Sequence, residues 1–218
     1  ATVRDVAYQQ ISHHDRRSLH GRAARYLIEL GEPPLVAATH ALRSRDRAIE
    51  LEVLPAAGSA ATKAWDLKLA TSIYERLVEI EDGADREDAG LELARLDLIA
   101  GRSDRFTALL EPRSHEPARR AGQDLVLAEH AFNSGRLTES YDHARSALDA
   151  VDPHHESAQA AREMLVRILG EQGNHQAAIE LASDMLARAV EAGAPHAEVA
   201  ALASLGVARA LSGQAGEA

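Results

Sequence analysis

Four short stretches of the chain share one pattern: LIAGRSDRF at residues 98–106, FNSGRLTES at 132–140, GEQGNHQAA at 170–178 and ALSGQAGEA at 210–218. In each stretch an apolar run with helical spacing ends at a glycine, polar residues follow, and a second run begins with small residues. Glycine adopts the left-handed backbone conformation that ends many helices, so the chain can reverse within a few residues. The stretches therefore predict helical hairpins that turn at Gly101, Gly135, Gly173 and Gly213.

The spacing of these glycines indicates a repeat. Successive turn glycines are 34, 38 and 40 residues apart. An interval of about 34 residues is the period of the tetratricopeptide (TPR) repeat, and the longer intervals fit the same unit with extended turns between repeats. In the hairpin around Gly135, small residues recur at helical spacing, as Ala128 and Ala131 on the first helix and Ala144 and Ala147 on the second. We therefore expect an all-α fold, an α-solenoid of TPR-like antiparallel helix hairpins.

The rest of the chain continues the helical pattern. Residues 51–80 form a degenerate hairpin in which Trp65 stands where the turn glycine would be. We expect this tryptophan to have a core or hinge role, and the alternative is that it anchors a partner. Alternating strand patterns and Asn-Gly or Asp-Gly hairpin signals are missing from the sequence. Apolar periodicity and the Gly, Pro, Asp, Asn and Ser breaks predict helices at residues 3–10, 13–30, 34–43, 46–62, 66–81, 86–100, 103–111, 116–133, 137–150, 155–171, 175–192 and 196–212.

Composition excludes several classes of function. The 24 basic and 34 acidic residues give a formal charge of −10, whereas binding to duplex nucleic acid ordinarily needs a basic surface. The chain has no cysteine, and no opening segment has the features of a signal peptide, so we expect a cytoplasmic location. No apolar stretch approaches the roughly 20 residues that span a bilayer, so we expect no membrane association.

The N-terminal third resembles a known family. The stretch VRDVAYQQISHHDRRSLHGRAARYLIELGEPPLVAATHALRSRDRAIELEVLPAAGSAA, residues 3–61, is similar to the segment after the ATPase module in large ATP-binding LuxR-type (STAND) regulators of bacterial transcription. The matching features include Val6-Ala7-Tyr8, Asp15-Arg16-Arg17 and the Gly31-Glu32-Pro33-Pro34 turn. The resemblance covers residues 3–80 by motif and the remainder by repeat architecture alone.

The resemblance implies a division of the chain. Residues 1–45 would be a helical junction that follows an absent ATPase module, and residues 46–218 would be TPR-like repeats, the last of them truncated. ATP would bind only in the upstream module, because this chain has no G-x-x-x-x-G-K-[ST] phosphate loop and no basic recognition helix near its end. We expect no cofactor in this fragment and no direct contact with nucleic acid.

Residue patterns that suggest chemistry all have simpler interpretations. Residues 58–63, GSAATK, lack the second glycine of a phosphate loop and lie in a helical pattern. The adjacent pairs His13-His14 and His154-His155 point about 100° apart on a helix, which disfavours shared metal ligation. His20 and His40 are expected to pack at a helix interface. We therefore expect no catalytic residue, no metal site and no enzyme activity.

The candidate binding surface is the concave one, because first helices of successive hairpins line it in a solenoid. In the register set by the turn glycines, its inward-facing polar positions are Arg95, Glu129, Asn133, Glu163 and Arg167. Two arginines opposite carboxylates would suit a peptide or an acidic small molecule. The same residues would equally form solvated ion pairs with one another.

These features predict a non-catalytic TPR-like sensor and protein-interaction scaffold, which relays the binding of an effector or partner to ATPase and DNA-binding domains outside this fragment. The alternatives are a general TPR adaptor for a peptide partner and the regulatory region of a kinase or nucleotide cyclase. The last hairpin lacks its second helix, so the apolar residues Leu202, Leu205, Val207 and Leu211 are expected either to fray or to pair with a second copy in a homodimer.

Overall fold

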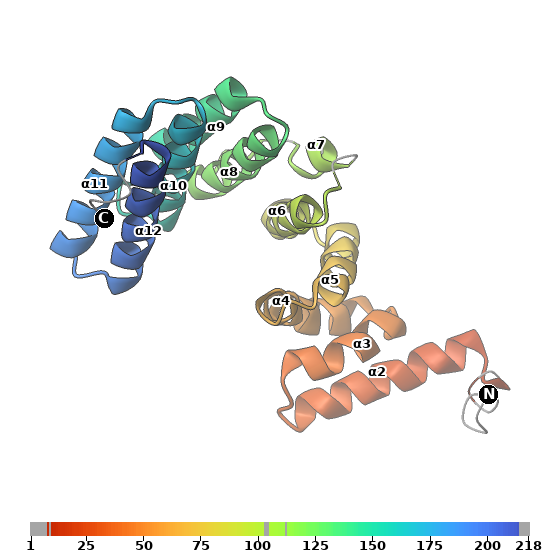
Figure 1. Cartoon of the computed structure of the whole chain (residues 1–218). Coiled ribbons are helices and arrows are strands. Elements are labelled where there is room, and N and C mark those ends of the chain that lie inside the picture. Colours follow the sequence, from red (N-terminus) through yellow and green to blue (C-terminus); the bar gives the residue numbers. More distant parts are fainter. Residues whose placement is uncertain (1–7, 9, 103–104, 112, 214–218) are drawn as a thin grey trace. The chain divides into compact units, whose positions relative to one another are not determined.

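The computed structural model describes residues 8, 10–102, 105–111 and 113–213. These residues form eleven helices and no strand, which confirms the all-α prediction (Figure 1). The chain divides into two compact units, Ala1–Leu110 and Glu111–Ala218, and each is described by itself.

Unit 1 contains three helix pairs that follow one another along the chain. Within it, each helix packs against its neighbours in sequence, α2 also contacts α4, and α3 also contacts α5. Its elements are α2 (His13–Glu29), α3 (Pro34–Ser44), α4 (Arg47–Lys63), α5 (Leu67–Ile80), α6 (Gly83–Ile99) and the short α7 (Phe106–Leu109).

Unit 2 shows the packing expected of stacked hairpins. The first hairpin, α8 with α9, packs against α10 through both of its helices, and the second, α10 with α11, packs against α12 in the same way. Its elements are α8 (Pro117–Asn133), α9 (Leu137–Ala150), α10 (Glu156–Glu171), α11 (His175–Glu191) and α12 (Pro195–Leu211). A continuous solenoid over residues 46–218 stays a prediction, as does the division at residue 45.

The predicted turns are confirmed by the backbone. Gly101, Gly135, Gly173 and Gly213 all have positive φ, between 67° and 80°. Trp65 occupies the corresponding turn between α4 and α5 with φ of 58°, and Gly31 does so between α2 and α3 with φ of 71°. The left-handed turn thus recurs at intervals of 34 and 36 residues upstream of Gly101 as well.

Two expectations need correction. The indole of Trp65 does not lie in a core, since the residue is 72% exposed. The helix expected at residues 103–111 is only four residues long, Phe106–Leu109, and the proline at position 112 disfavours its extension through Glu111. Of the helix expected at 3–10, only residues 8 and 10 are described, and the rest lies outside the described residues.

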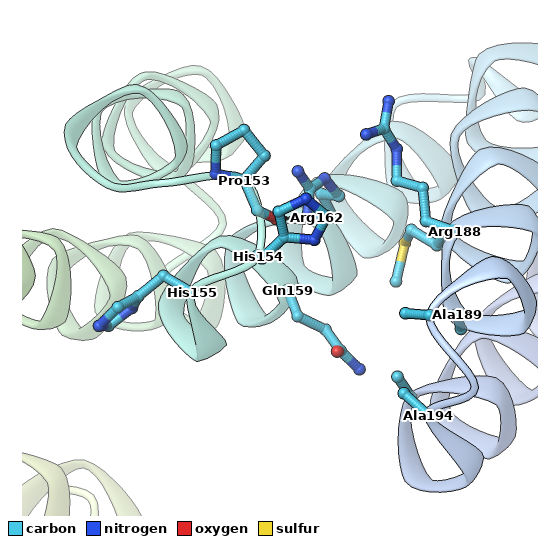
Figure 2. Close-up of a pocket in the computed structure, with 11 residues that line it drawn as sticks. Pro153, His154, His155, Gln159, Arg162, Arg188, Ala189 and Ala194 are labelled. Atoms are coloured by element: carbon cyan, nitrogen blue, oxygen red, sulfur yellow. Dashed lines mark hydrogen bonds between the residues drawn. The ribbon is translucent and has the colours of Figure 1, made fainter.

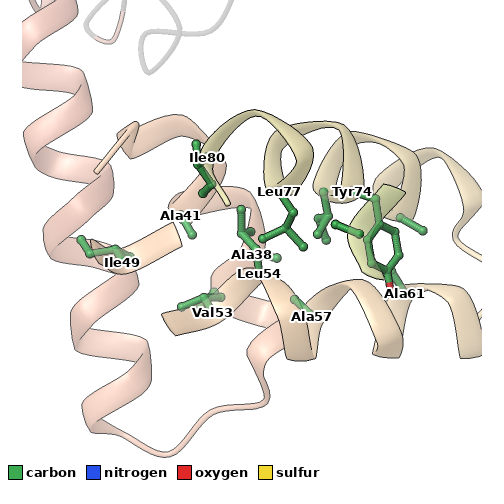
Figure 3. Packing of buried hydrophobic residues seen from close by; sticks show 14 of the residues in the cluster. Ala38, Ala41, Ile49, Val53, Leu54, Ala57, Ala61, Tyr74, Leu77 and Ile80 are labelled. Carbon is green, nitrogen blue, oxygen red and sulfur yellow. The ribbon is translucent and has the colours of Figure 1, made fainter. Parts of the chain in front are cut away.

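Most of the core of unit 1 is one cluster shared by successive helices. Figure 3 shows side chains from α3, α4 and α5 meeting, with Tyr74 and Leu77 of α5 against the alanines of α4. Alanines keep the helix axes close, while the larger residues fill the space between them. Its fully buried larger members include Ile49, Leu54, Ile73, Leu77 and Leu93.

Unit 2 has smaller clusters between each pair of helices. One joins Ala128 of α8 and Ala144 of α9 to Leu165 and Ile168 of α10. Another joins Val166 of α10 to α11 and α12. Each hairpin therefore depends on its neighbour for a covered apolar face, as expected of repeat proteins.

Candidate functional site

The structure brings two of the predicted site residues together. Arg167 of α10 donates from Nη1 to Oε2 of Glu129 on α8 at 2.9 Å and from Nη2 to Oε1 at 3.3 Å. The guanidinium also lies over the ring of Phe132, 4.6 Å from its centroid. These two first helices thus carry a forked ion pair between adjacent hairpins.

The other predicted residues lie apart from this pair. Glu163 accepts a hydrogen bond from Nε2 of Gln159 on its own helix at 3.1 Å, and Asn133 is exposed at the end of α8. Arg95 lies on α6 in unit 1, where it donates to Glu92 at 2.8 Å. Both arginines are therefore engaged by carboxylates of their own unit, as the ion-pair interpretation describes, and their role in ligand binding stays a prediction.

A pocket in unit 1 lies where α4, α5 and α6 meet. It has a cavity volume of about 520 Å³. Its apolar lining includes the exposed Leu51 and Pro55 of α4 and the buried Tyr74 and Leu77. The remaining lining is acidic apart from Ala89, and consists of Glu81, Asp85, Asp88 and Glu92.

The electrostatics of this pocket favour a cationic occupant. Burial raises the pKa of the Glu81 carboxyl, and the nearby negative charges of Asp85 and Asp88 raise it further. A carboxyl whose pKa is raised has too little positive charge nearby to stabilise its ionised form. A bound cation would therefore offset the repulsion between these carboxylates. Glu92 pairs with Arg95 on its own helix.

The helix α4 has a backbone carbonyl without a helical donor beside this pocket. Pro55 lies inside this helix and has no N–H, so the carbonyl of Leu51 lacks its usual helical donor. Both residues line the pocket. Sequence reasoning missed this site, although the proline inside a helical run and the acidic residues at 81–92 were visible signals.

Buried carboxylates elsewhere are held by arginines and serve the fold. Glu50 is fully buried and receives two hydrogen bonds of 2.8 Å from the fork of Arg76. Asp97 is also fully buried and accepts from Arg102 and Arg105 at distances of 2.7 to 3.1 Å. Both carboxylates are fully buried and neutralised by arginines, so they serve packing and do not face a pocket.

Three histidines have structural roles. His155 caps α10 by accepting from the Ser157 N–H at 3.1 Å, and His20 packs against His40 with their Nδ1 atoms 2.9 Å apart, which confirms the interface prediction. No group of three or more His, Cys, Asp or Glu side chains suited to a metal occurs in the described part of the chain.

The segment 58–63 lies within α4 and is helical. A Cβ added at Gly58 would come within 2.9 Å of the Tyr74 ring, so this glycine permits close packing of α4 on α5. It therefore does not open a phosphate-binding loop.

Comparisons with known proteins returned nothing: no family model, no curated protein and no solved structure matches the chain. Among the helices that the structure describes, none is both long and apolar enough to cross a membrane.

Proposed function

We propose that the chain is a non-catalytic binding scaffold whose pocket between α4, α5 and α6 receives a basic segment of a protein partner. The observation that carries this proposal is the combination of four carboxylates with an apolar floor in one cavity of about 520 Å³. A lysine or arginine side chain has an apolar stem and a cationic head, and these match the floor and the acidic lining respectively.

The pocket also favours a peptide over an isolated ion. Leu51 and Pro55 remain exposed on α4, and covering their apolar surface would add to the free energy of binding. The Leu51 carbonyl offers an acceptor to an ammonium or a peptide N–H. An extended or helical segment with basic and apolar residues would use all three features together.

The wider role that we propose is that of a sensor and interaction module in a signal-responsive regulator of transcription. Support for this role comes from the junction motif in residues 3–61 and from the stacked hairpins, and the proposal includes a cytoplasmic location. Binding would act on distant domains only through a difference in affinity between two arrangements of the chain. A general adaptor and the regulatory region of a kinase or cyclase remain the alternatives, and the flanking gene sequence distinguishes them.

Titration of a labelled basic peptide tests the pocket. A fluorescein-labelled peptide of alternating lysine and leucine should bind with saturable anisotropy that weakens with salt. The double variant Glu81→Gln/Asp85→Asn should weaken binding about five- to tenfold, because each exposed charge contributes up to ~1 kcal/mol. The matched control Asp142→Asn/Asp149→Asn removes two carboxylates from α9, which is outside the pocket, and should bind like the wild type. Equal affinity of the two double variants would refute the site.

Self-association at the last hairpin stays a prediction. Val199, Leu202 and Val207 on α12 are 53% to 68% exposed, whereas Leu205 is buried. A second copy of the chain covering these residues would give a homodimer detectable by sedimentation. The variant Leu202→Glu should then shift the chain to monomer, and a wild type that is monomeric at high concentration would contradict the prediction.

A further inference from the structure

A small pocket in unit 2 combines two arginines with an apolar floor. It has a cavity volume of about 120 Å³, several times the ~15 Å³ that a single water needs. Figure 2 shows Gln159 and Arg162 on α10 across the pocket from Arg188 and Ala189 on α11, with Ala194 at the start of α12. The site thus lies where the second hairpin meets the next helix.

Arg162 is the residue of this pocket whose charge is least compensated. Its Nη1 donates to the carbonyl oxygen of Pro153 at 3.0 Å, and no described carboxylate lies within ion-pair distance of it. Burial and the positive charge of Arg188 lower the pKa of the Arg162 guanidinium, against a smaller opposite effect of Asp184. Holding this charged group half-buried therefore costs free energy that a bound anion would recover.

Arg188 supplies a second cation at the mouth of the pocket. It donates from Nε to Asp184 at 2.7 Å, and its side chain is half-exposed. Glu191 adds a second negative charge near Arg188, but neither carboxylate lies within ion-pair distance of Arg162, so the Arg162 guanidinium is the cation left for a ligand. Among the described residues, the hydrogen bond of Arg188 to Asp184 uses Nε alone, so its Nη groups can turn toward a ligand.

The start of α12 adds partial positive charge. Ala194 provides no side-chain cap, and Pro195 occupies the first turn of this helix. The N–H groups of a first turn have no intrahelical acceptor, and they attract anions. Ala194 and Ala197 from this turn line the pocket, whereas the first turn of α10 is already capped by His155.

We propose that this pocket binds the oxyanion of a small molecule, a phosphate or carboxylate group attached to a short apolar portion. Planar guanidinium groups pair with either kind of oxyanion through two parallel hydrogen bonds. Met185, Ala189 and Ala192 form an apolar wall beside the arginines, where a short alkyl portion would lie. The site is independent of the acidic pocket of unit 1 and would make the chain a sensor of a small anionic metabolite.

Nuclear magnetic resonance titrations of the full chain with inorganic phosphate and, separately, with butyrate test this proposal. Saturable shifts are expected for the amides of Gln159 and Ala197 and for the Arg162 side chain. Arg162→Gln should weaken binding at least about tenfold, because a hydrogen bond between charged groups is lost, and Arg188→Gln should weaken it less. A tighter response to phosphate identifies a phosphate-bearing ligand, and a tighter response to butyrate identifies a carboxylate with an apolar tail.

Two further variants keep the test decisive. Arg145→Gln on α9 removes an arginine that pairs with Asp149 four residues away, just as Arg188 pairs with Asp184, and it should bind like the wild type. Arg162→Lys keeps the positive charge and should retain weaker, saturable binding, which separates loss of the site from loss of the fold. Shifts that do not saturate, or that persist at wild-type affinity in Arg162→Gln, would overturn the proposal.

Discussion

The two units differ in how their apolar contacts are grouped and in how many partners hold a buried carboxylate. In unit 1 one large cluster runs from Ala24 to Leu96, and the buried carboxylate of Glu50 has Arg76 as its arginine partner. In unit 2 the apolar contacts are divided among smaller clusters, and Asp124 is shared by Arg113, His143 and Ser146. A single change should therefore be felt more widely in unit 1 than in unit 2.

The largest expected difference concerns these buried carboxylates. Arg76→Met leaves Glu50 buried without a cation and should destabilise unit 1 by about 3–5 kcal/mol. Arg113→Met leaves His143 and Ser146 on Asp124 and should cost about 1–2 kcal/mol. Hydrogen exchange of amides in α4 and α5, compared with those in α8 and α9, measures the two effects separately.

The control for this pair is Arg47→Met. Arg47 and Asp82 lie 3.3 Å apart, but their side chains are 62% and 89% exposed. Their pair should contribute less than ~1 kcal/mol. If Arg76→Met proves no more destabilising than Arg113→Met, then the number of partners does not decide how much each buried carboxylate depends on its arginine.

The helices and turns were predictable because their signals are local. Helical periodicity and the glycines at 101, 135 and 173 placed most helix ends within three residues of their observed positions. Even Trp65 was placed correctly in its turn by the repeat, although its exposure was not. Local sequence fixes a helix end because capping and left-handed backbone depend on neighbouring residues.

The pockets were not predictable because they depend on contacts between distant residues. Leu51 and Glu92 of the acidic pocket are 41 positions apart, and Arg162 and Arg188 of the other pocket are 26 positions apart. Nothing in a single sequence distinguishes an arginine that pairs across two helices from one that faces solvent. The repeat register did predict Glu129 and Arg167 as inward-facing positions, because the repeat period relates first helices to one another. These two residues meet across α8 and α10.

Two helical glycines offer a second contrast between the units. A Cβ at Gly90 would come within 2.9 Å of the carbonyl oxygen of Leu109, whereas a Cβ at Gly170 would meet the end of the exposed Leu211 side chain at 2.9 Å. Backbone cannot yield easily, so Gly90→Ala should cost about 1–3 kcal/mol. Gly170→Ala should be neutral or stabilising by up to ~1 kcal/mol, because alanine favours the helix and Leu211 can move. Urea denaturation checks both, and equal losses would contradict the argument.

The turns give a third contrast, with effects of opposite sign. Gly135 has φ of 74°, so Gly135→Ala should destabilise unit 2 by about 1 kcal/mol. Trp65 already has a side chain at φ of 58° and is largely exposed, so Trp65→Gly should stabilise unit 1 by up to ~1 kcal/mol. Thermal unfolding would show the two midpoints moving in opposite directions. A loss of stability in Trp65→Gly would mean that the indole makes a contact worth more than the backbone strain.

The smallest expected effect is a dependence of unit 1 on pH. His20 is 9% exposed, with Tyr8 Oη 2.8 Å from its Nε2 and His40 at its Nδ1. Burial lowers the pKa of His20 below the ordinary value of 6.5, and the nearby charges of His40 and Arg43 lower it further.

As the pH falls through about 6.5, the unfolded chain binds a proton at His20 and the folded chain does not. The free energy of unfolding should therefore decrease as the pH falls below about 7 and level off once the pH is below the lowered pKa. Urea denaturation at pH 7.5 and 5.5, followed at the amide signals of α2 and α3, measures this loss of stability, and His20→Gln should reduce it.

The matched control His196→Gln changes an exposed histidine of unit 2 and should leave the loss in unit 1 intact. A wild-type unit 1 that is equally stable at both pH values would show that protonation of His20 costs the fold nothing.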